Sequence, residues 1–176
     1  MTERPFANAW LETPRLRMRP TLPDDFENFY LLGSDPEVMR YISDGVPRPR
    51  EDALLAFLKM AEHWCEHGFG IWVLEDRETG QYLGRCGLRQ LPDIGEVELL
   101  YTLMRHAWGR GVATESATAA LRYGFDVVQL QRIIALAMPG NVASWHIMEK
   151  LGMRLEKTTP YKGVECVWYA IERKNG

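Results

Sequence analysis

The sequence has few cysteines and no long apolar segment. Its three cysteines, Cys65, Cys86 and Cys166, are odd in number and far apart, so they predict neither a disulfide framework nor a CxxC metal pair. Isolated thiols are typical of a reducing compartment, and we expect a cytoplasmic protein. No run approaches the roughly 18 apolar residues of a membrane span, and residues 1–10 lack the apolar core of a signal peptide. Neither a membrane partner nor a bound metal is expected.

The chain also lacks an excess of positive charge. It has 21 Lys and Arg against 24 Asp and Glu, a net charge of −3, whereas a nucleic-acid-binding surface needs a basic footprint. A nucleic-acid partner is therefore not expected. What the chain does have is 176 residues, 46% of them hydrophobic, which is enough for one globular domain over residues 1–176.

Hydrophobic periodicity predicts the secondary structure. Strands are expected at 15–19, 70–75, 82–88, 96–104, 132–138 and 165–171. Helices are expected after Asp24, from Glu51 to Gly68, over 113–125 and over 144–151. In the second helix, a stripe with helical spacing is formed by Leu54, Leu58, Ala61 and Cys65. This order predicts a mixed α/β domain with antiparallel pairs among the closely spaced strands and one parallel crossover around the helix at 113–125.

A glycine-rich stretch, RHAWGRGVATE, joins a predicted strand to that helix over residues 105–115. Gly109 and Gly111 allow positive φ angles and bring bare N–H groups close to a ligand. The first turn of a helix offers unpaired donors and a partial positive charge to a phosphate. Neither a Walker A lysine nor the third glycine of a dinucleotide fingerprint is present, since Thr114 stands at that position. A glycine turn that only starts the helix explains the stretch equally well.

Other blocks decide between these readings. They are TPRLR at 13–17, ELLYTL at 98–103, WGRGVATE at 108–115, NVAS at 141–144 and EKLGM at 149–153. With these blocks in this order, the chain resembles the GCN5-related N-acetyltransferases, and most of all the branch of RimJ/RimL-type ribosomal-protein N-terminal acetyltransferases. The resemblance implies a mixed, mostly antiparallel sheet with a splayed parallel strand pair, flanked by helices. It also implies transfer of an acetyl group from acetyl-CoA to a primary amine, a protein N-terminal α-amine or a small amine, by direct attack in a ternary complex.

The same resemblance assigns the cofactor site. It implies that the acetyl-CoA pyrophosphate lies on the main-chain N–H groups of Arg110, Gly111, Val112, Ala113 and Thr114. The first position of the family's motif, which is usually polar, is Trp108 here, so the pyrophosphate is expected to be bound mainly by the backbone. The pantetheine arm is expected to pair with the preceding strand near Leu103. Asn141 is expected to contact or support the cofactor, although an Asx turn explains it nearly as well.

The resemblance also suggests catalytic groups. Glu98 is the candidate base, acting through a water, with Glu96 on the same strand face as its rival; either could be a solvent-facing carboxylate instead. In many relatives a tyrosine protonates the leaving thiolate, but Met148 occupies that position here. Ser144 is the candidate in its place, or it caps its helix, and a water or no acid at all remains an alternative.

The acceptor site is the least defined part of the prediction. Tyr41, Trp72 and Tyr161 are candidates to line it, and core packing explains each of them individually. The identity of the amine is left open, and a homodimer is possible because relatives form one.

Two other functions compete with acetyl transfer. His63, Glu66 and His67 match H-x-x-E-H, an inverted zinc-hydrolase motif, but Gly68 ends the helix there and no third ligand is evident. A non-catalytic acyl-CoA sensor on the same fold is the second alternative, because a fold does not fix a function.

Overall fold

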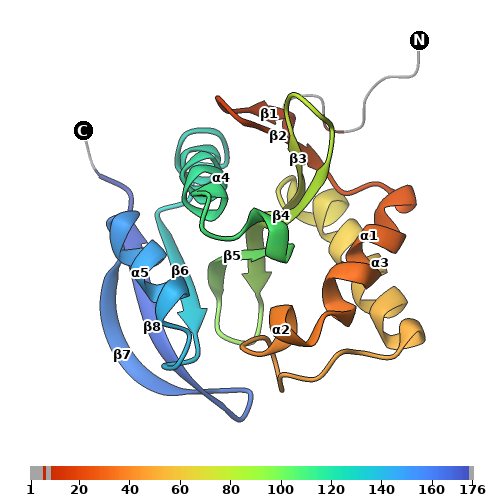
Figure 1. Cartoon of the computed structure of the whole chain (residues 1–176). Coiled ribbons are helices and arrows are strands. Elements are labelled where there is room, and N and C mark those ends of the chain that lie inside the picture. Colours follow the sequence, from red (N-terminus) through yellow and green to blue (C-terminus); the bar gives the residue numbers. More distant parts are fainter. Residues whose placement is uncertain (1–5, 7–8, 175–176) are drawn as a thin grey trace.

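The structure, a computed structural model, describes residue 6 and residues 9–174. In this part of the chain one sheet has the strand order β1-β2-β3-β4-β5-β6-β8-β7 (Figure 1). The strands are β1 Leu11–Glu12, β2 Leu16–Pro20, β3 Ile71–Asp76, β4 Tyr82–Leu91, β5 Glu96–Leu103, β6 Arg132–Ala137, β7 Arg154–Tyr161 and β8 Val164–Glu172. The α-helices are α1 Phe26–Ser34, α2 Pro36–Met39, α3 Arg50–His67, α4 Val112–Arg122 and α5 Val142–Lys150.

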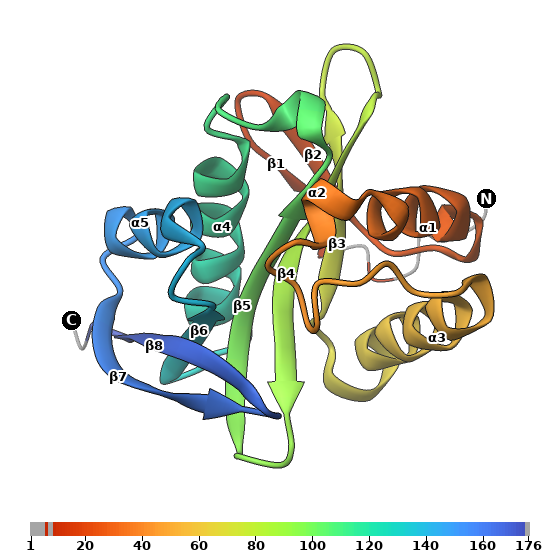
Figure 2. The same ribbon diagram turned by 60° about the horizontal axis from the view of Figure 1, so that its bottom comes forward.

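The sheet separates two layers of helices. Arg85 and Cys86 are successive residues of β4 and therefore point to opposite faces. The Arg85 guanidinium lies over the ring of Phe29 from α1, whereas the Cys86 thiol contacts Ser116 of α4. Figure 2 shows the result, with α4 and α5 on one side of β4 and β5 and with α1 and α3 on the other. Within the described ranges, no helix is both long and apolar enough to cross a membrane.

One strand pair differs from all the others. Every neighbouring pair is antiparallel except β5 and β6, which are parallel and meet in register only at Glu98 and Ile134. On its other side β5 pairs with β4 along its whole length, from Glu96 to Leu103. The crossover between β5 and β6 contains α4, as predicted. The predicted fold class, a mostly antiparallel sheet with one splayed parallel pair, is confirmed.

The helix α3 buries a different face from the predicted one. Its buried residues are Ala53, Phe57 and Trp64, whereas Leu54 is 41% exposed and Leu58 is 48% exposed. Two apolar stripes compete on this helix, and the one with the larger aromatic side chains is buried. Its end was predicted correctly, because Gly68 adopts a left-handed conformation and its N–H bonds the Trp64 carbonyl at 3.0 Å.

The strand β7, Arg154–Tyr161, had no counterpart in the predicted secondary structure. It lies at the edge of the sheet and pairs only with β8. Most of its side chains are exposed, so its sequence carries no alternation of buried and exposed residues that would mark a strand. Tertiary pairing, rather than local pattern, makes this segment extended.

Candidate active site

The glycine-rich stretch forms an open helix start. Gly109 and Gly111 have φ of +69° and +76°, a conformation that side-chain-bearing residues rarely adopt. Gly111 is the N-cap of α4, and no side chain caps this end. The first-turn N–H groups of Val112, Ala113 and Thr114 have no partner within the helix. Together with the helix dipole, they form a site suited to an anion.

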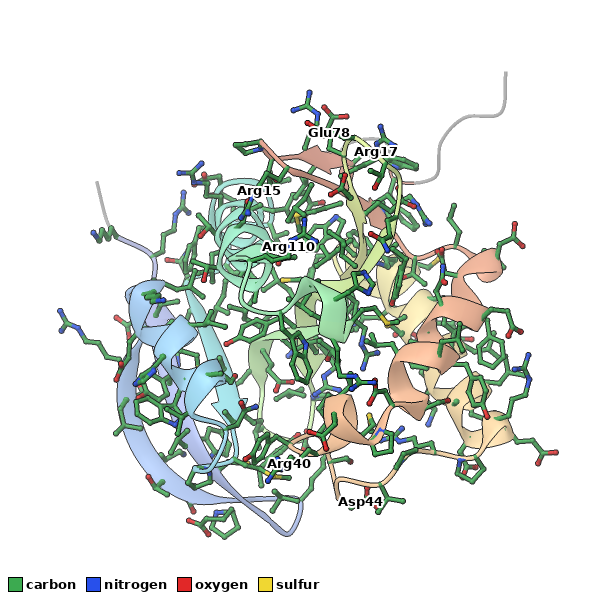
Figure 3. The ribbon with its side chains drawn as sticks, in the orientation of Figure 1. Arg15, Arg17, Arg40, Asp44, Glu78 and Arg110 are labelled. Atoms are coloured by element: carbon green, nitrogen blue, oxygen red, sulfur yellow. The ribbon has the colours of Figure 1, made fainter. Side chains whose placement is uncertain are left out.

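Two residues from a distant part of the chain, Thr13 and Arg15, hold this loop in place. The Arg15 guanidinium donates from Nη1 to the Arg110 carbonyl at 2.6 Å and from Nε to Glu115 Oε2 at 2.6 Å. The Thr13 hydroxyl donates to the other Glu115 oxygen at 2.5 Å. Figure 3 shows Arg15 and Arg110 close to the start of α4. Burial opposes ionisation of Glu115, but the bonds from Thr13 and Arg15 outweigh it and lower the pKa of this carboxyl.

Trp108 has a role that the sequence did not reveal. Its side chain is partly exposed, and its indole N–H donates to the Leu103 carbonyl at 2.9 Å. The tryptophan therefore fastens the glycine loop to the end of β5. Because its indole N–H donates to this carbonyl, the polar group of Trp108 is directed to β5.

The end of β5 presents free backbone toward β6. The Met104 N–H bonds the Leu83 carbonyl of β4, and antiparallel pairing alternates the direction of backbone groups along a strand. The N–H and C=O groups of Tyr101 and Leu103 therefore point away from β4. Since β6 pairs with β5 only at Glu98, this row is available to an extended ligand. Leu103 lies in it, although its carbonyl already accepts the Trp108 indole.

Tyr101 is a polar residue that the sequence analysis missed. Its hydroxyl donates to the Ser144 carbonyl at 2.8 Å and lies 3.1 Å from Ser144 Oγ, so it joins β5 to α5. Burial raises the pKa of this phenol. Helix α5 begins at Val142, and Asn141 caps it by accepting the Ser144 N–H at 3.3 Å. Asn141 thus has the Asx-type role that was the alternative for it, and Ser144 is not the cap.

Met148 occupies the position at which many relatives have a tyrosine that protonates the thiolate. Met148 is 1% exposed and belongs to the core, so nothing at this position replaces the relatives' tyrosine. Tyr101 supplies a tyrosine hydroxyl to the same helix from another element. Its only sequence signal was a polar side chain on the apolar face of β5 that carries Val97 and Leu99.

The two candidate bases, Glu98 and Glu96, differ in how many of their carboxylate oxygens accept a hydrogen bond. Glu98 is 6% exposed, and its Oε2 accepts Nε of Arg89 at 3.1 Å and Nη2 at 2.5 Å. Among the described residues its Oε1 has no hydrogen-bond partner. Both oxygens of Glu96 accept from Nε of Arg132, at 3.1 and 3.3 Å, and Arg132 also bonds Glu156. Glu98 is thus the buried carboxylate with a free oxygen, whereas Glu96 belongs to an ion-pair network.

The three candidate acceptor residues lie in different places. Tyr41, 36% exposed, lies beside Gly140 after β6. Tyr161 bonds Asp93 through its hydroxyl at 3.0 Å and lies on the β7 side of the sheet. Trp72 is 0% exposed, and its indole donates to a main-chain carbonyl at 2.6 Å. Trp72 is a core residue and cannot contact an acceptor here, so we remove it from the candidate site.

The zinc motif is used for packing. His63 Nδ1 lies 2.8 Å from the Phe69 carbonyl, and its Nε2 accepts the Gln90 N–H at 2.9 Å. Both ring nitrogens are thus occupied, and burial lowers the pKa of this imidazole. Across the residues that the structure describes, no group of three or more His, Cys, Asp or Glu side chains could hold a metal. His63 is not placed to ligate zinc, which overturns the hydrolase alternative.

The N-terminus of α4 is thus suited to bind an anion, and it lies next to the parallel strands β5 and β6, which separate after Glu98 and Ile134. Over residues 15–154 the chain matches the family described as "Acetyltransferase (GNAT) domain". The chain belongs to the GNAT acetyltransferase family. Its sequence is 37% identical over 163 residues to the uncharacterized protein YkkB of Bacillus subtilis, covering 86% of this chain and 89% of YkkB. Membership makes the protein an acyltransferase.

Solved GNAT structures share the fold. The acetyltransferase of Agrobacterium tumefaciens superposes with a TM-score of 0.83 at 26% identity, covering 93% of this chain and 94% of that one. RimL, a ribosomal L7/L12 α-N-protein acetyltransferase solved with CoA, superposes with a TM-score of 0.76 at 13% identity, covering 91% and 95%. The predicted family is confirmed, and its RimL-type fold is shared.

Proposed function

We propose that this protein transfers the acetyl group of acetyl-CoA to a primary amine. The observation that carries the proposal is the open start of α4 beside the unpaired edge of β5, which suits a pyrophosphate joined to an extended arm. The RimL structure contains CoA. Spermidine N(1)-acetyltransferase of Escherichia coli, 25% identical over 150 residues that cover 80% of this chain and 74% of its own, is named for an amine acceptor.

In this proposal the backbone holds the cofactor. The N–H groups of residues 110–114 bind the pyrophosphate, and Arg15 adds positive charge beside the loop. The pantetheine arm lies along β5 and bonds the groups of Tyr101 and Leu103 that point away from β4. Asn141 supports this site indirectly, because its side-chain oxygen starts the helix that carries Ser144. One N–H of β5 also faces the thioester and stabilises the oxyanion that develops there.

Glu98 removes the proton from the amine through a bound water. An α-amine has a pKa of about 8 and a lysine amine about 10.4, so an α-amine needs less help at neutral pH. The neutral nitrogen attacks the thioester carbon, the new C–N bond forms and the C–S bond breaks. Starting from an ammonium group, the balance is an amide, the CoA thiol and one released proton.

Ser144 stabilises the departing thiolate by a hydrogen bond. The Tyr101 hydroxyl donates a hydrogen bond to the Ser144 carbonyl and so fixes the backbone of Ser144, whose own O–H turns from the Tyr101 oxygen to the thiolate; Tyr101 is thus a positioning residue. A thiol has a pKa of about 8.5, so the released thiolate takes its proton from solvent at neutral pH. This arrangement replaces the tyrosine acid that Met148 cannot supply.

The proposal is tested by measuring CoA thiol release from acetyl-CoA with a panel of primary amines. Glu98→Gln keeps a partner for Arg89 but removes the base, so kcat should fall about 100-fold or more at pH 7. The loss of kcat should become smaller as the pH approaches the pKa of the acceptor amine, because more of the amine is then already neutral. The matched variant Glu96→Gln should keep kcat near the wild-type value.

Other results would change the assignment. A loss confined to Glu96→Gln would make Glu96 the base. Binding of acetyl-CoA without thiol release from any amine would make the protein a non-catalytic acyl-CoA sensor. No binding of acetyl-CoA would remove the proposed function altogether.

We also infer a cytoplasmic location. The three cysteines are free thiols, which suits a reducing compartment, and fractionation of the native cell would test this. A homodimer remains a prediction, and the mass of the purified protein in solution would decide it.

A further inference from the structure

Arg85 is an arginine without a carboxylate. It lies in the middle of β4, on the face covered by α1 and α3, with its guanidinium 4.7 Å from the centre of the Phe29 ring. Its Nη1 lies 3.6 Å from the sulfur of Met60. The Nε atom is buried and has no hydrogen-bond partner. Buried charged groups are usually paired, and because the Arg85 side chain as a whole is only partly buried, an anion from solvent can reach the rest of its guanidinium.

The charged groups nearest to Arg85 are also arginines. Burial has the largest influence and lowers the pKa of the Arg85 guanidinium to about 10; Tyr82 opposes this shift, and Arg89 and Arg48 add to it. Arg89 is neutralised by Glu98. Within the described part of the chain, neither Arg48 nor Arg85 has a carboxylate within ion-pair distance, and Arg48 has only a 3.5 Å contact with the Ser43 hydroxyl. Arg85 is therefore a partly buried positive charge without an anionic partner, whereas Arg48 is exposed to solvent.

These arginines share a face of the sheet with the proposed base. Arg85 pairs with Thr102 and Arg89 pairs with Glu98 across β4 and β5, and residues four apart on a strand point to the same side. Arg85 and Arg89 are therefore about 13 Å apart along β4. Arg48, from the segment between α2 and α3, completes a positive region over this face. An acceptor that puts its amine near Glu98 would extend toward Arg85.

We propose that the acceptor carries a carboxylate in the same molecule as its amine, and that Arg85 and Arg48 bind this carboxylate. The inference rests on the proposed acetyl transfer and narrows its substrate class to short peptides and to amino acids whose reacting amine lies on a long side chain, because an α-amine is too close to its own carboxylate to reach Glu98 while the carboxylate binds Arg85. A planar guanidinium pairs with a carboxylate by two parallel hydrogen bonds. A polyamine would bring further positive charge to a region that is already positive, and is disfavoured.

The test compares acceptors that differ only in the carboxylate. Lysine is paired with 1,5-diaminopentane and 6-aminohexanoic acid with pentylamine, and CoA thiol release gives kcat/KM for each. The amino acid of each pair should be used about ten-fold better or more, the effect expected of a charge-assisted hydrogen bond. Equal or better use of the decarboxylated amines would overturn the proposal while leaving acetyl transfer in place.

Variants assign the preference to the arginines. Arg85→Gln should reduce it to within about three-fold, and Arg85→Met, which keeps the packing against Phe29 and Met60, should do the same. Arg48→Gln should reduce it partly. Arg77→Gln is the control, since this exposed arginine pairs with Glu12 at 3.3 Å, and it should keep the wild-type preference. A folded Arg85→Met protein that keeps the full preference would contradict the role of Arg85.

A second readout does not depend on turnover. With CoA bound, each ligand's effect on the thermal unfolding midpoint is measured. Lysine should raise the midpoint of the wild type more than 1,5-diaminopentane does, and should lose this advantage in Arg85→Gln. The opposite ranking would overturn the inference. If no amine at all releases CoA, the proposed function fails, and this measurement still tests the anion site by itself.

Discussion

At the start of α4 the side chains of Arg15 and Glu115 bind each other, whereas on the face of β4 that carries Arg85 the guanidinium groups of Arg85 and Arg48 have no carboxylate partner among the described residues. Arg15 is satisfied by Glu115 and by the Arg110 carbonyl, so the groups left open there are main-chain N–H groups. On the other face the open groups are guanidinium groups of Arg85 and Arg48. A backbone site fits the phosphate of a shared cofactor, and a side-chain site can vary with the acceptor. The start of α4 thus serves cofactor binding, and the arginine side chains on the other face serve recognition of the acceptor.

The largest effect should come from closing the backbone site. Gly111→Val puts a β-branched side chain at φ of +76°, with the new Cβ 3.2 Å from Arg15 Nη2, so the loop must change shape. Acetyl-CoA affinity should fall beyond detection in a calorimetric titration. Gly80→Val is matched, because Gly80 has φ of +71° and open space in the turn between β3 and β4. Both variants lose about 1–2 kcal/mol of stability, but only the first should lose the cofactor.

A smaller effect should separate chemistry from binding. Tyr101→Phe removes the hydroxyl that holds Ser144, and kcat should fall about ten-fold while KM for acetyl-CoA stays unchanged. Ser144→Ala should behave alike, and the double variant should be no worse than either single one, because the two act as a unit. A raised KM with normal kcat would show that Tyr101 serves the cofactor instead.

The smallest effect should come from breaking the contacts of Glu115 with Thr13 and Arg15. Glu115→Gln leaves Arg15 without its carboxylate and should cost about 1 kcal/mol at pH 7, since Arg15 is half exposed. The folded pKa of Glu115 is lowered, so its contribution is present above the unfolded value of about 4.5 and is lost as the pH falls through the folded value. Denaturant unfolding should therefore show a smaller difference in stability between wild type and variant at pH 3 than at pH 7. An equal gap at both values would contradict an electrostatic role.

The cofactor end could be predicted from the sequence because its determinants are local. Gly109, Gly111 and the helix after them lie within one short stretch, and backbone geometry there depends on glycine itself. The blocks around it identified the family. What the stretch did not reveal was the partner of each side chain, because Trp108 bonds β5 and Glu115 bonds Thr13, about a hundred residues away.

The acceptor face could not be predicted in the same way. Arg85 and Arg48 are distant in sequence and meet only through the packing of α1 and α3 on the sheet. Trp72 was proposed for this site, but it faces the core because strand register decides which side chains point inward. Tyr101 was missed because the family's usual tyrosine was sought on α5, whereas this hydroxyl reaches α5 from β5.

One measurement tests the division between the two regions most directly. Amide and arginine Nε resonances of ¹⁵N-labelled protein are followed while acetyl-CoA and then CoA with lysine are added. The account predicts that acetyl-CoA shifts the amides of residues 110–114 and leaves the Arg85 Nε resonance unchanged, and that lysine then shifts Arg85. Cofactor binding that leaves the amides of 110–114 unmoved would contradict the account.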